Sequence, residues 1–420
     1  MWEHTRCSRT GLITTCGKPL EVIHPGHRNI HAGADFTGAL IRIGGLVWGG
    51  SVEVHLRSGD WKRHGHHLDP AYNNVILHVI LHYEGEIINA SGQQVPSCRL
   101  KITEPVVKRA EQLFVPKCEP ACGPFLGQAE RPFLFTWIRQ LGRKRSEQKS
   151  HPDSEILSNR ALSREECFFR ILGRGFGLPV NAAPFEWLVS MIPYSLMAEA
   201  RHSLPDLEAI LFGQAGFLGS PAGSGSYYAS LTERYRSYRK YLQSGPLDPR
   251  LWKYLRLRPA AFPTVRIAQF ASLLHHRIPL IASILEAGSL PEMEQRFRVK
   301  ASEFWDTHYL FQRSASQVCK FIGPQTFHIL VINAVVPFLR ALGHAEKRKK
   351  YTGRAHDLLL EVEAESNHVI KKWITFGVRP GNALESQGLI QLYWEFCSEQ
   401  RCLFCKLGIS ILEDSMNEKP

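Results

Sequence analysis

The chain has 420 residues, of which 44% are hydrophobic and 21% are charged. This composition is ordinary for a folded protein, excludes a disordered or fibrous chain, and provides enough sequence for about two or three domains or one large irregular one. Lysine and arginine number 51 against 39 aspartate and glutamate residues, which gives a formal net charge of +12. Such a charge favours a polyanionic partner such as DNA, RNA or an acidic membrane surface.

The ten cysteines are too few to form a disulfide framework in a chain of this size. The first residues are polar and lack the apolar core of a signal peptide, and no run approaches the ~18 apolar residues of a membrane span. We therefore expect a cytoplasmic protein without a membrane partner. In a reducing cytoplasm, clustered cysteines more often bind metal or act in redox chemistry than form disulfides.

Residues 10–105 are predicted to be rich in β-structure. Four short apolar runs, bounded by Gly, Pro, Asn and Asp, are typical of strands: residues 20–23, 40–43, 52–56 and 75–81. Glycine pairs at positions 44–45 and 49–50 flank residues 46–48 and predict tight hairpins at both pairs. We expect a small mixed sheet here, with helical spacing beginning near Glu104.

Two carboxylates and an imidazole fall on two of these strands. Asp35 opens the strand that contains residues 40–43, and Glu53 and His55, two positions apart on the next strand, point to the same face. A hairpin between the strands brings Asp35 close to Glu53. The two carboxylates are then expected to bind Mg²⁺ or Mn²⁺, which lowers the pKa of a water molecule and stabilises charge on a scissile phosphate. His55 would orient or deprotonate that water.

This pattern resembles the restriction-endonuclease-like, or PD-(D/E)XK, nucleases. In them an Asp, often after Pro, begins one strand, and a Glu or Asp, any residue and then Lys lie on the next. The resemblance carries over directly to Asp35 and Glu53. Ala34 stands where Pro is common, and that Pro makes no chemistry. His55 stands where Lys is usual, and histidine is a weaker charge stabiliser at neutral pH, although it serves as a base or a ligand.

The segment after the second strand adds further candidate side chains: Asp60, Trp61, His64, His66, His67 and Asp69. Very-short-patch-repair nucleases, within the same superfamily, also place a Trp and a His-Gly-His segment after the catalytic strand. By this resemblance Asp60 adds a group next to the proposed metal, and His66 or Asp69 is a base or an orienting residue.

A zinc site is an alternative use of the same segment. Four suitable ligands occur there, although their crowding works against a tetrahedral site: His64, His66, His67 and Asp69. A zinc hydrolase of a small substrate therefore stays open. Ten of the 19 histidines fall within the first 82 residues, which favours a site in this region. Taken one at a time, five others are expected only to hydrogen-bond the loop backbone: His24, His27, His31, His78 and His82.

From about residue 125 the chain is predicted to be mostly helical. Apolar residues recur with helical spacing over residues 133–149, 165–172, 185–201, 204–217, 265–285 and 356–376. Residues 219–226 are rich in Gly and Ser and predict a flexible loop between helices. No internal repeat of fixed period occurs.

Basic and aromatic residues gather within this helical part, at positions 234–241, 252–258 and 347–350. Arginine and tyrosine together contact phosphates and stack on unpaired bases. Arg256, Arg258 and Arg266 are the residues expected to grip the phosphates of a nucleic acid. The alternative for any one cluster is a solvated helix face.

Three cysteines lie close together near the C-terminus, at Cys397, Cys402 and Cys405. This spacing predicts zinc or an iron–sulfur cluster, with Cys118 or Cys122 supplying a further ligand. Some nucleases similar to the restriction-endonuclease-like group close their fold with such a cluster, held by C-terminal cysteines and one distant cysteine. The alternative is a set of buried thiols without metal.

The chain from Leu12 to Leu412 resembles an uncharacterised bacterial family known only as a domain of unknown function. The resemblance rests on residues 33–36, 52–55, 58–61, 72–79, 208–216, 256–259 and 262–264, and on the cysteine tail. The family has Pro at the position of Ala34 and begins with an apolar helix before Leu12, which this polar start lacks. A truncated or mis-started N-terminus is the expectation that follows.

These observations predict an α+β protein. Residues 1–105 would form a β-rich core of restriction-endonuclease-like type, residues 106–390 a helical region with basic clusters, and residues 391–420 a cysteine-containing tail. The leading hypothesis is a divalent-metal-dependent nuclease that hydrolyses phosphodiester bonds. One alternative is a catalytically inactive nucleic-acid-binding or scaffold protein with a nuclease-like core, and another is the zinc hydrolase of a small substrate.

Overall fold

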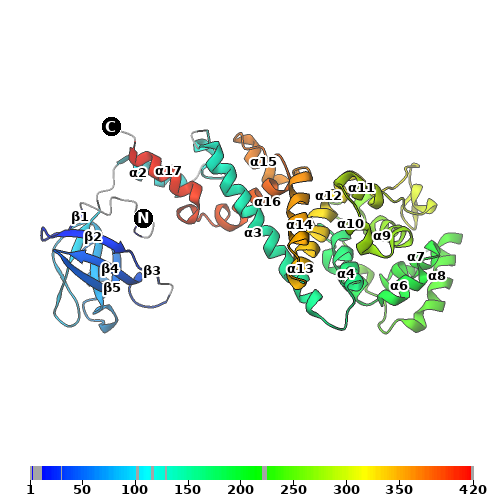
Figure 1. Ribbon diagram of the computed structural model, residues 1–420, viewed down its shortest axis with the longest axis horizontal. Helices are drawn as coiled ribbons and strands as arrows, with labels where there is room; N and C mark the ends of the chain where they lie inside the picture. Colours follow the sequence, from blue (N-terminus) through cyan, green and yellow to red (C-terminus); the bar gives the residue numbers. More distant parts are fainter. Residues whose placement is uncertain are drawn as a thin grey trace. The chain divides into compact units, whose positions relative to one another are not determined.

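The computed structural model describes residues 2, 12–29, 31–100, 104–114, 118–127, 130–219 and 225–417. The chain divides into two compact units, one made of Met1–Ala129 with Trp394–Pro420 and the other of Glu130–Tyr393. The structure confirms a mixture of α and β elements, with a sheet near the N-terminus and a mostly helical remainder (Figure 1). The polar start at residues 3–11 and most of the expected loop, residues 220–224, lie outside the described residues.

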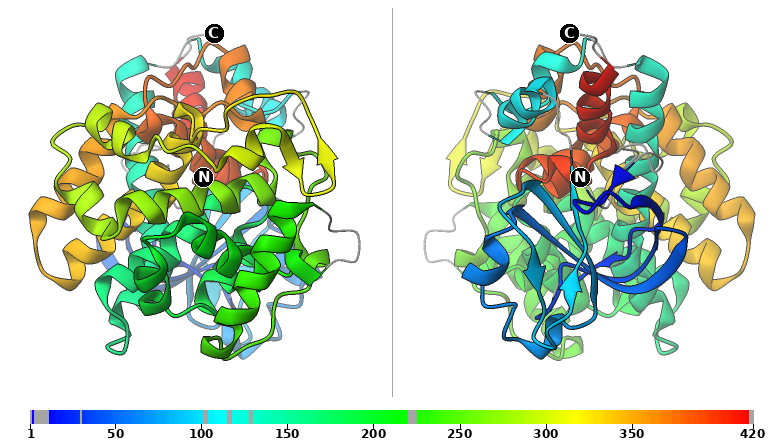
Figure 2. Two further views of the ribbon diagram at one scale, coloured as in Figure 1. Left: turned by 90° about the vertical axis from the view of Figure 1, so that its right-hand side faces the viewer. Right: turned by 90° about the vertical axis from the view of Figure 1, so that its left-hand side faces the viewer.

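The first unit contains a seven-stranded mixed sheet, drawn in blue and cyan on the right of Figure 2. Its strands are β1 (Leu12–Ile13), β2 (Pro19–His24), β3 (His27–Arg28), β4 (Phe36–Ile43), β5 (Leu46–Arg57), β6 (Val75–His82) and β9 (Ser97–Arg99). The order is β1-β2-β4-β5-β6-β9, and β3 pairs with β4. Strands β2, β4 and β5 pair antiparallel, whereas β6 lies parallel to β5 and β9 parallel to β6.

The four strands expected from the apolar runs are confirmed as β2, β4, β5 and β6. Gly44 and Gly45, with φ of +57° and +94°, form the two-residue turn between β4 and β5, which matches the twist of the strands. The hairpin expected at Gly49 and Gly50 was wrong, because both residues lie inside β5. A Cβ at Gly50 would lie 2.6 Å from the carbonyl oxygen of Asn74, so glycine there permits a close approach of the chain entering β6.

A buried tryptophan fixes the connection between β5 and β6. This crossover contains only one short helix, α1 (Asp60–Arg63), and the 3₁₀ turn Pro70–Tyr72. Trp61 in α1 is fully buried and packs with Ala34, Val75 and the hairpin of β7 (Ile87–Ile88) and β8 (Gln94–Val95). Its indole Nε1 donates to the carbonyl oxygen of Ile88 at 2.9 Å. The buried Trp61 therefore fixes the position of α1, and with it the start of the loop that follows.

Two helices from distant parts of the sequence complete the first unit. α2 (Glu104–Phe114) confirms the helical start expected at Glu104, and it packs beside α17 (Lys406–Asn417) (Figure 1). The 3₁₀ turn Gly123–Phe125 follows α2, and the π-helical segment Tyr393–Cys397 and the 3₁₀ turn Cys402–Phe404 precede α17.

The second unit is built from helices around one large apolar core, seen in green and yellow on the left of Figure 2. Its helices are α3 (Arg131–Ser158), α4 (Arg164–Phe176), α5 (Ala182–Ser190), α6 (Tyr194–Ala200), α7 (Leu204–Gln214), α8 (Ser226–Tyr238), α9 (Pro263–Arg277), α10 (Leu280–Leu285), α11 (Leu290–Phe297), α12 (Pro324–Leu330), α13 (Val336–Ala345), α14 (Lys349–Glu361), α15 (His368–Thr375) and α16 (Ala383–Leu392). A small hairpin, β10 (His308–Leu310) and β11 (Arg313–Ser314), is part of it.

Three segments expected as single helices are each divided in two. Residues 185–201 form α5 and α6, residues 265–285 form α9 and α10, and residues 356–376 form α14 and α15. Pro193 and Pro279 stand at the first two breaks, where proline lacks the N–H that a continuing helix needs. Apolar spacing continued across the first two breaks because α5 and α6, and likewise α9 and α10, face the same core.

One helical segment, Pro324–Ala345, is long and apolar enough to cross a membrane by length and composition. From the sequence we expected no run close to the ~18 apolar residues of a membrane span. Of its 18-residue apolar window, 78% is buried against the rest of the protein, which is also the environment of a core helix.

Helices α3 and α16 approach each other through small residues. A Cβ at Gly142 of α3 would clash with the carbonyl oxygen of Leu384, and a Cβ at Gly388 of α16 would clash with the carbonyl oxygen of Ile138. Two facing glycines therefore set the distance between the helices, because backbone atoms cannot move aside as a side chain can.

We predict that Gly388→Ala lowers the free energy of unfolding by about 1–3 kcal/mol, since the added methyl group overpacks the α3–α16 contact. Gly353→Ala in α14 is the matched control, because nothing lies within 4 Å of its Cβ, and it should be neutral or stabilising by up to about 1 kcal/mol. Urea denaturation of both variants provides the measurement. Equal stability of the two variants would contradict the proposed close contact.

Candidate metal site on the mixed sheet

The hairpin of β4 and β5 joins the two predicted carboxylates. Phe36 pairs with Val52 across the strands, so Asp35, just before β4, lies beside Glu53. The backbone N–H of Asp35 donates to Oε2 of Glu53 at 2.9 Å, and Oδ2 of Asp35 accepts from the N–H of Val54 at 3.0 Å. Asp35 is exposed, whereas Glu53 is only 5% exposed. The pair therefore offers one buried and one accessible carboxylate.

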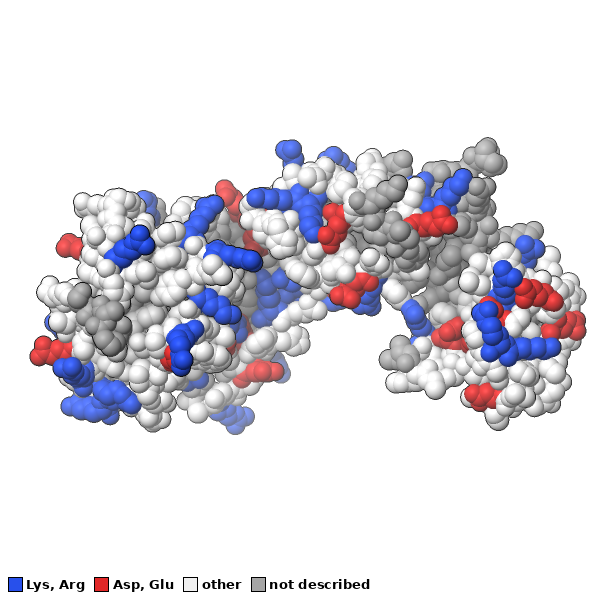
Figure 3. Space-filling view, turned by 180° about the vertical axis from the view of Figure 1, so that it is seen from behind, with Lys and Arg blue, Asp and Glu red and all other residues white. Residues whose placement is uncertain are grey.

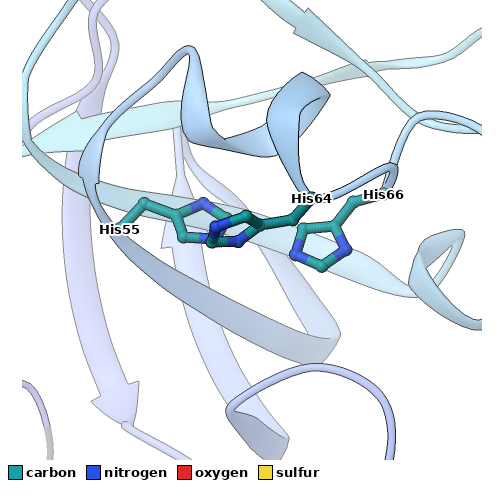
Figure 4. A group of neighbouring side chains, drawn as sticks. All are labelled: His55, His64 and His66. Atoms are coloured by element: carbon teal, nitrogen blue, oxygen red, sulfur yellow. The ribbon is translucent and has the colours of Figure 1, made fainter.

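Two histidines lie against the buried carboxylate, and a third lies against one of them. Oε1 of Glu53 lies 3.4 Å from Nε2 of His55 and 3.2 Å from Nε2 of His66. Nε2 of His55 lies 3.1 Å from Nδ1 of His64. One ring nitrogen from each of His55, His64 and His66 lies within 4.8 Å of the other two, and the rings point toward one another (Figure 4). We call Glu53, His55, His64 and His66 the histidine cluster.

Local backbone geometry brings the two loop histidines to this cluster. His64 is the C-cap of α1, and Gly65 follows with φ of +80°, a conformation that glycine adopts without strain. The N–H of His66 then donates to the carbonyl oxygen of Trp61 at 3.1 Å. The ring of His66 stacks on Tyr72, with centroids 3.8 Å apart. The sequence Trp-Lys-Arg-His-Gly-His thus turns both imidazoles back toward β5.

A fourth histidine supports the cluster from β6. His78 is fully buried, and its Nε2 lies 2.9 Å from Nδ1 of His55. This contact leaves Nε2 of His55 facing the other rings, as an orienting partner of a metal-binding histidine does. His78 had been expected to bond only to the loop backbone. One feature of the sequence pointed to this role: His78 is the one polar residue in the apolar run 75–81. In the parallel register of β5 and β6 it lies next to Glu53.

Burial favours the uncharged forms of the groups in the cluster. Burial, together with the neighbouring imidazoles, lowers the pKa of His55 to about 4 and that of His78 to about 3. The pKa of His66 is lowered as well, mainly by burial. Burial raises the pKa of Glu53 to about 7. At neutral pH the rings of His55 and His66 are therefore neutral, each with a lone pair that can bind a metal.

Two other predicted carboxylates are held in local structure. Oδ2 of Asp60 accepts from the N–H of Arg57 at 3.1 Å, and its Oδ1 pairs with Arg63 at 2.8 Å. Oδ1 of Asp69 accepts from the N–H of Ala71 at 2.9 Å and so caps the 3₁₀ turn Pro70–Tyr72. Among the described residues, the structure groups His64 and His66 with His55, and not with His67 and Asp69 as the zinc alternative expected.

The histidine cluster borders an open cleft of about 470 Å³. Asp35 and His55 line it together with Arg28, and Phe404 from the C-terminal segment also lines it. The guanidinium of Arg28 lies 5.1 Å from the centre of the Phe404 ring, within the range of a cation–π contact. The cleft therefore gives a ligand access to the exposed carboxylate, next to a positive charge.

The predicted phosphate-binding arginines belong to the second unit. Arg256 and Arg258 are exposed. Arg266 is partly buried, and its Nη1 donates to Gln269 at 3.1 Å and to Thr326 at 2.9 Å. Only the first two present their guanidinium groups openly to solvent.

The predicted cysteine ligands all lie in the first unit. Cys122, Cys402 and Cys405 are buried, and Cys118 and Cys397 are partly buried.

Comparison with known families gives one match. The chain matches a family described as "Protein of unknown function (DUF2851)" over residues 1–368. Neither the curated proteins nor the solved structures contain a match. The matched segment includes the whole sheet, the histidine cluster and most of the helical unit. The chain therefore belongs to the DUF2851 family of proteins of unknown function.

Proposed function

We propose that this protein is a divalent-metal-dependent nuclease whose active site is the histidine cluster with Asp35. The observation that carries the proposal is the convergence of one buried carboxylate and three imidazoles beside a second, exposed carboxylate. A bound cation would bring the nitrogen atoms of the three rings and the buried carboxylate into one favourable interaction.

The donor set fits a metal ion. Nε2 of His66 is buried and makes no hydrogen bond within the described part of the chain, although it faces the Glu53 carboxylate. Bonding to a cation would satisfy this nitrogen together with those of His55 and His64. Imidazole ligands suit Zn²⁺ and the later transition metals best; Mn²⁺, a transition metal that also binds carboxylates, accepts such a mixed set more readily than Mg²⁺, which prefers an all-oxygen shell. We therefore propose Mn²⁺, ahead of Mg²⁺, as the ion used for nucleic-acid cleavage.

The protein groups would divide the work between them. A bound divalent ion would polarise a phosphoryl oxygen and lower the pKa of a water molecule. Glu53, His55, His64 and His66 would hold the ion, and His78 would fix the ring of His55. Oδ1 of Asp35 makes no hydrogen bond within the described residues, so it would accept a proton from the attacking water. Arg28 would hold a phosphate in the cleft.

The strands at the site and the charge of the whole chain support a polyanionic substrate. The resemblance to PD-(D/E)XK nucleases implied an Asp that begins one strand and a Glu on the next, and here Asp35 directly precedes β4 and Glu53 lies on its antiparallel neighbour β5. Lys and Arg side chains are spread over the described face in Figure 3, with fewer acidic ones among them. This surplus, together with the net charge of +12, favours binding of a phosphate backbone.

A zinc hydrolase of a small substrate is the second candidate. Three histidines and a carboxylate are a donor set typical of zinc, and the cleft of about 470 Å³ is in the size range of small-molecule pockets. The proposed nuclease and the zinc hydrolase would use the same metal ligands and differ in the substrate that binds in the cleft.

We predict that His64→Ala weakens Mn²⁺ binding by roughly 10- to 100-fold, because one ligand of the cluster is lost. His64 is exposed, so the fold should be kept. Isothermal titration calorimetry with Mn²⁺ measures this affinity without interference from thiols, which select softer ions. His82→Ala, an exposed histidine at the end of β6, should bind Mn²⁺ as the wild type does. Equal affinities in both variants would contradict the assignment.

We predict that Glu53→Gln abolishes Mn²⁺-dependent cleavage of nucleic acid, with a loss of at least about 100-fold, because the amide keeps the volume but removes the ligand charge. Labelled single- and double-stranded DNA and RNA, incubated with Mn²⁺, Mg²⁺, Zn²⁺ or EDTA, provide the assay. Glu21→Gln on the neighbouring strand β2 is the matched control and should cleave normally.

The same assay separates the alternatives. Cleavage retained by Glu53→Gln would exclude this active site. Salt-sensitive binding without cleavage by the wild type would favour the inactive nucleic-acid-binding protein. Hydrolysis of small phosphate or carboxylate esters with Zn²⁺, without cleavage of nucleic acid, would favour the zinc hydrolase.

A further inference from the structure

Two arginines from near opposite ends of the sequence lie against one phenylalanine ring in the first unit. The guanidinium carbon of Arg28 lies 5.1 Å from the centre of the Phe404 ring, and that of Arg401 lies 5.3 Å from it. Both distances are within the range of a cation–π contact. Arg28 and Arg401 are exposed, and Phe404 is 37% exposed. We call Arg28, Arg401 and Phe404 the arginine clamp.

Strand pairing places Arg28 beside the proposed active site. β3 pairs antiparallel with the start of β4, so Arg28 lies opposite Phe36. The N–H of Asn29 donates to the carbonyl oxygen of Asp35 at 2.8 Å, which extends this pairing to the carboxylate residue. Gly26, with φ of +88°, forms the tight turn before β3, where a Cβ would lie 2.9 Å from a carbonyl oxygen of β4. Backbone contacts therefore hold Arg28 next to Asp35.

A 3₁₀ turn brings Arg401 and Phe404 together. Arg401 is the N-cap of the turn Cys402–Phe404, and its carbonyl oxygen accepts from the N–H of Phe404 at 3.0 Å. Side chains three residues apart in such a turn lie on the same side. The N–H of Arg401 donates to the carbonyl oxygen of Phe396 at 2.8 Å, which fixes the start of the turn. The turn therefore carries a cation and the ring that it contacts on one side.

The clamp carries two positive charges without a counter-charge. Within the described part of the chain, neither arginine side chain forms an ion pair or a hydrogen bond. Asp35 is the one acidic side chain among the described residues that line the cleft, and its Oδ2 accepts from the N–H of Val54. Two like charges against the same ring repel, and an anion bound to both would replace that repulsion with attraction. Guanidinium groups bind phosphate oxygens through pairs of N–H donors.

We infer that the arginine clamp binds the terminal phosphate of a nucleic-acid strand. A phosphomonoester carries about 1.5 to 2 negative charges at pH 7, which matches two guanidinium groups better than the single charge of an internal phosphodiester. The cleft of about 470 Å³ has the size of a small-ligand pocket, so it accepts the last nucleotide of a strand and not a duplex. Val54, Leu56 and Leu81 line it and offer an apolar surface to the base.

This inference rests on the proposed nuclease function and names its substrate class, which is strands with a phosphorylated end. Asp35 and His55 line the same cleft as Arg28 and Phe404. A strand whose terminal phosphate is held by the clamp would therefore extend toward the carboxylate and the imidazole of the proposed active site. Phe404 is a positioning residue, since it acts through the two guanidinium groups that it contacts.

The test is the binding of short single-stranded oligonucleotides to the full chain in EDTA, where no metal-dependent cleavage occurs. Oligonucleotides of one sequence, as DNA and as RNA, carry a 5′-phosphate, a 3′-phosphate or only hydroxyl ends. An internal dye reports binding by fluorescence anisotropy. We expect one phosphorylated form to bind roughly tenfold or more tightly than the hydroxyl form, because it adds charge-assisted hydrogen bonds to the clamp. The preferred form identifies the end of the strand that binds.

Substitutions then locate the preference. Arg28→Gln and Arg401→Gln should each remove it, and Phe404→Leu should reduce it by several-fold, since the ring that positions both arginines is lost. Arg42→Gln is the matched control and should keep it, because Arg42 is an exposed arginine of β4 that pairs with Glu21 outside the clamp. Thermal unfolding followed by circular dichroism checks that each variant is folded.

Two results would overturn the inference: equal affinity of the wild type for phosphorylated and hydroxyl ends, or an unchanged preference in folded Arg401→Gln. The binding test is separate from the cleavage assay, and Glu53→Gln should keep the preference although it is expected not to cleave. A preference without any cleavage by the wild type would support the clamp and contradict the nuclease. Cleavage without a preference would contradict the clamp alone.

Discussion

The burial of Glu53 is the constraint on which the rest of the site depends. A carboxylate taken out of water must be compensated by hydrogen bonds or by a cation. The β4–β5 register supplies one N–H, from Asp35, and the other oxygen faces the imidazoles of His55 and His66. Trp61, Tyr72 and His78 contribute through packing and contacts that hold those imidazoles in position. A cluster of rings around a buried carboxylate offers a favourable position for a positive charge, and the proposed ion supplies it.

The short connection between β5 and β6 explains why this site can form on so small a sheet. Parallel neighbours require a crossover, which is usually a full helix that covers one face of the sheet. Here α1 has only four residues, and a fully buried tryptophan anchors it. The rest of the crossover is free to fold back over β5. The segment between β5 and β6 thus both packs against the sheet and carries His64 and His66.

Much of the local structure followed from the sequence. The strands β2, β4, β5 and β6, the turn at Gly44 and the proximity of Asp35 to Glu53 follow from alternation and turn chemistry. The role of His78 did not, because a histidine in an apolar strand resembles any core residue until its partner is known. Nor did the choice of His64 and His66 over His67, since it depends on the backbone reversal at Gly65. The breaks in these helices were not predicted, because apolar spacing indicates which side of a segment is buried and does not show whether the helix is continuous.

The order of the two units along the chain has a consequence for biosynthesis. Since Glu130–Tyr393 separates the two parts of the first unit, α2 emerges from a ribosome long before α17, its packing partner. The sheet and the whole helical unit are then able to fold while the last segment is still being translated. The cleft acquires its second wall only after Leu403 and Phe404 have been translated. Any activity located in that cleft would accordingly be absent from nascent chains that have not yet reached this segment.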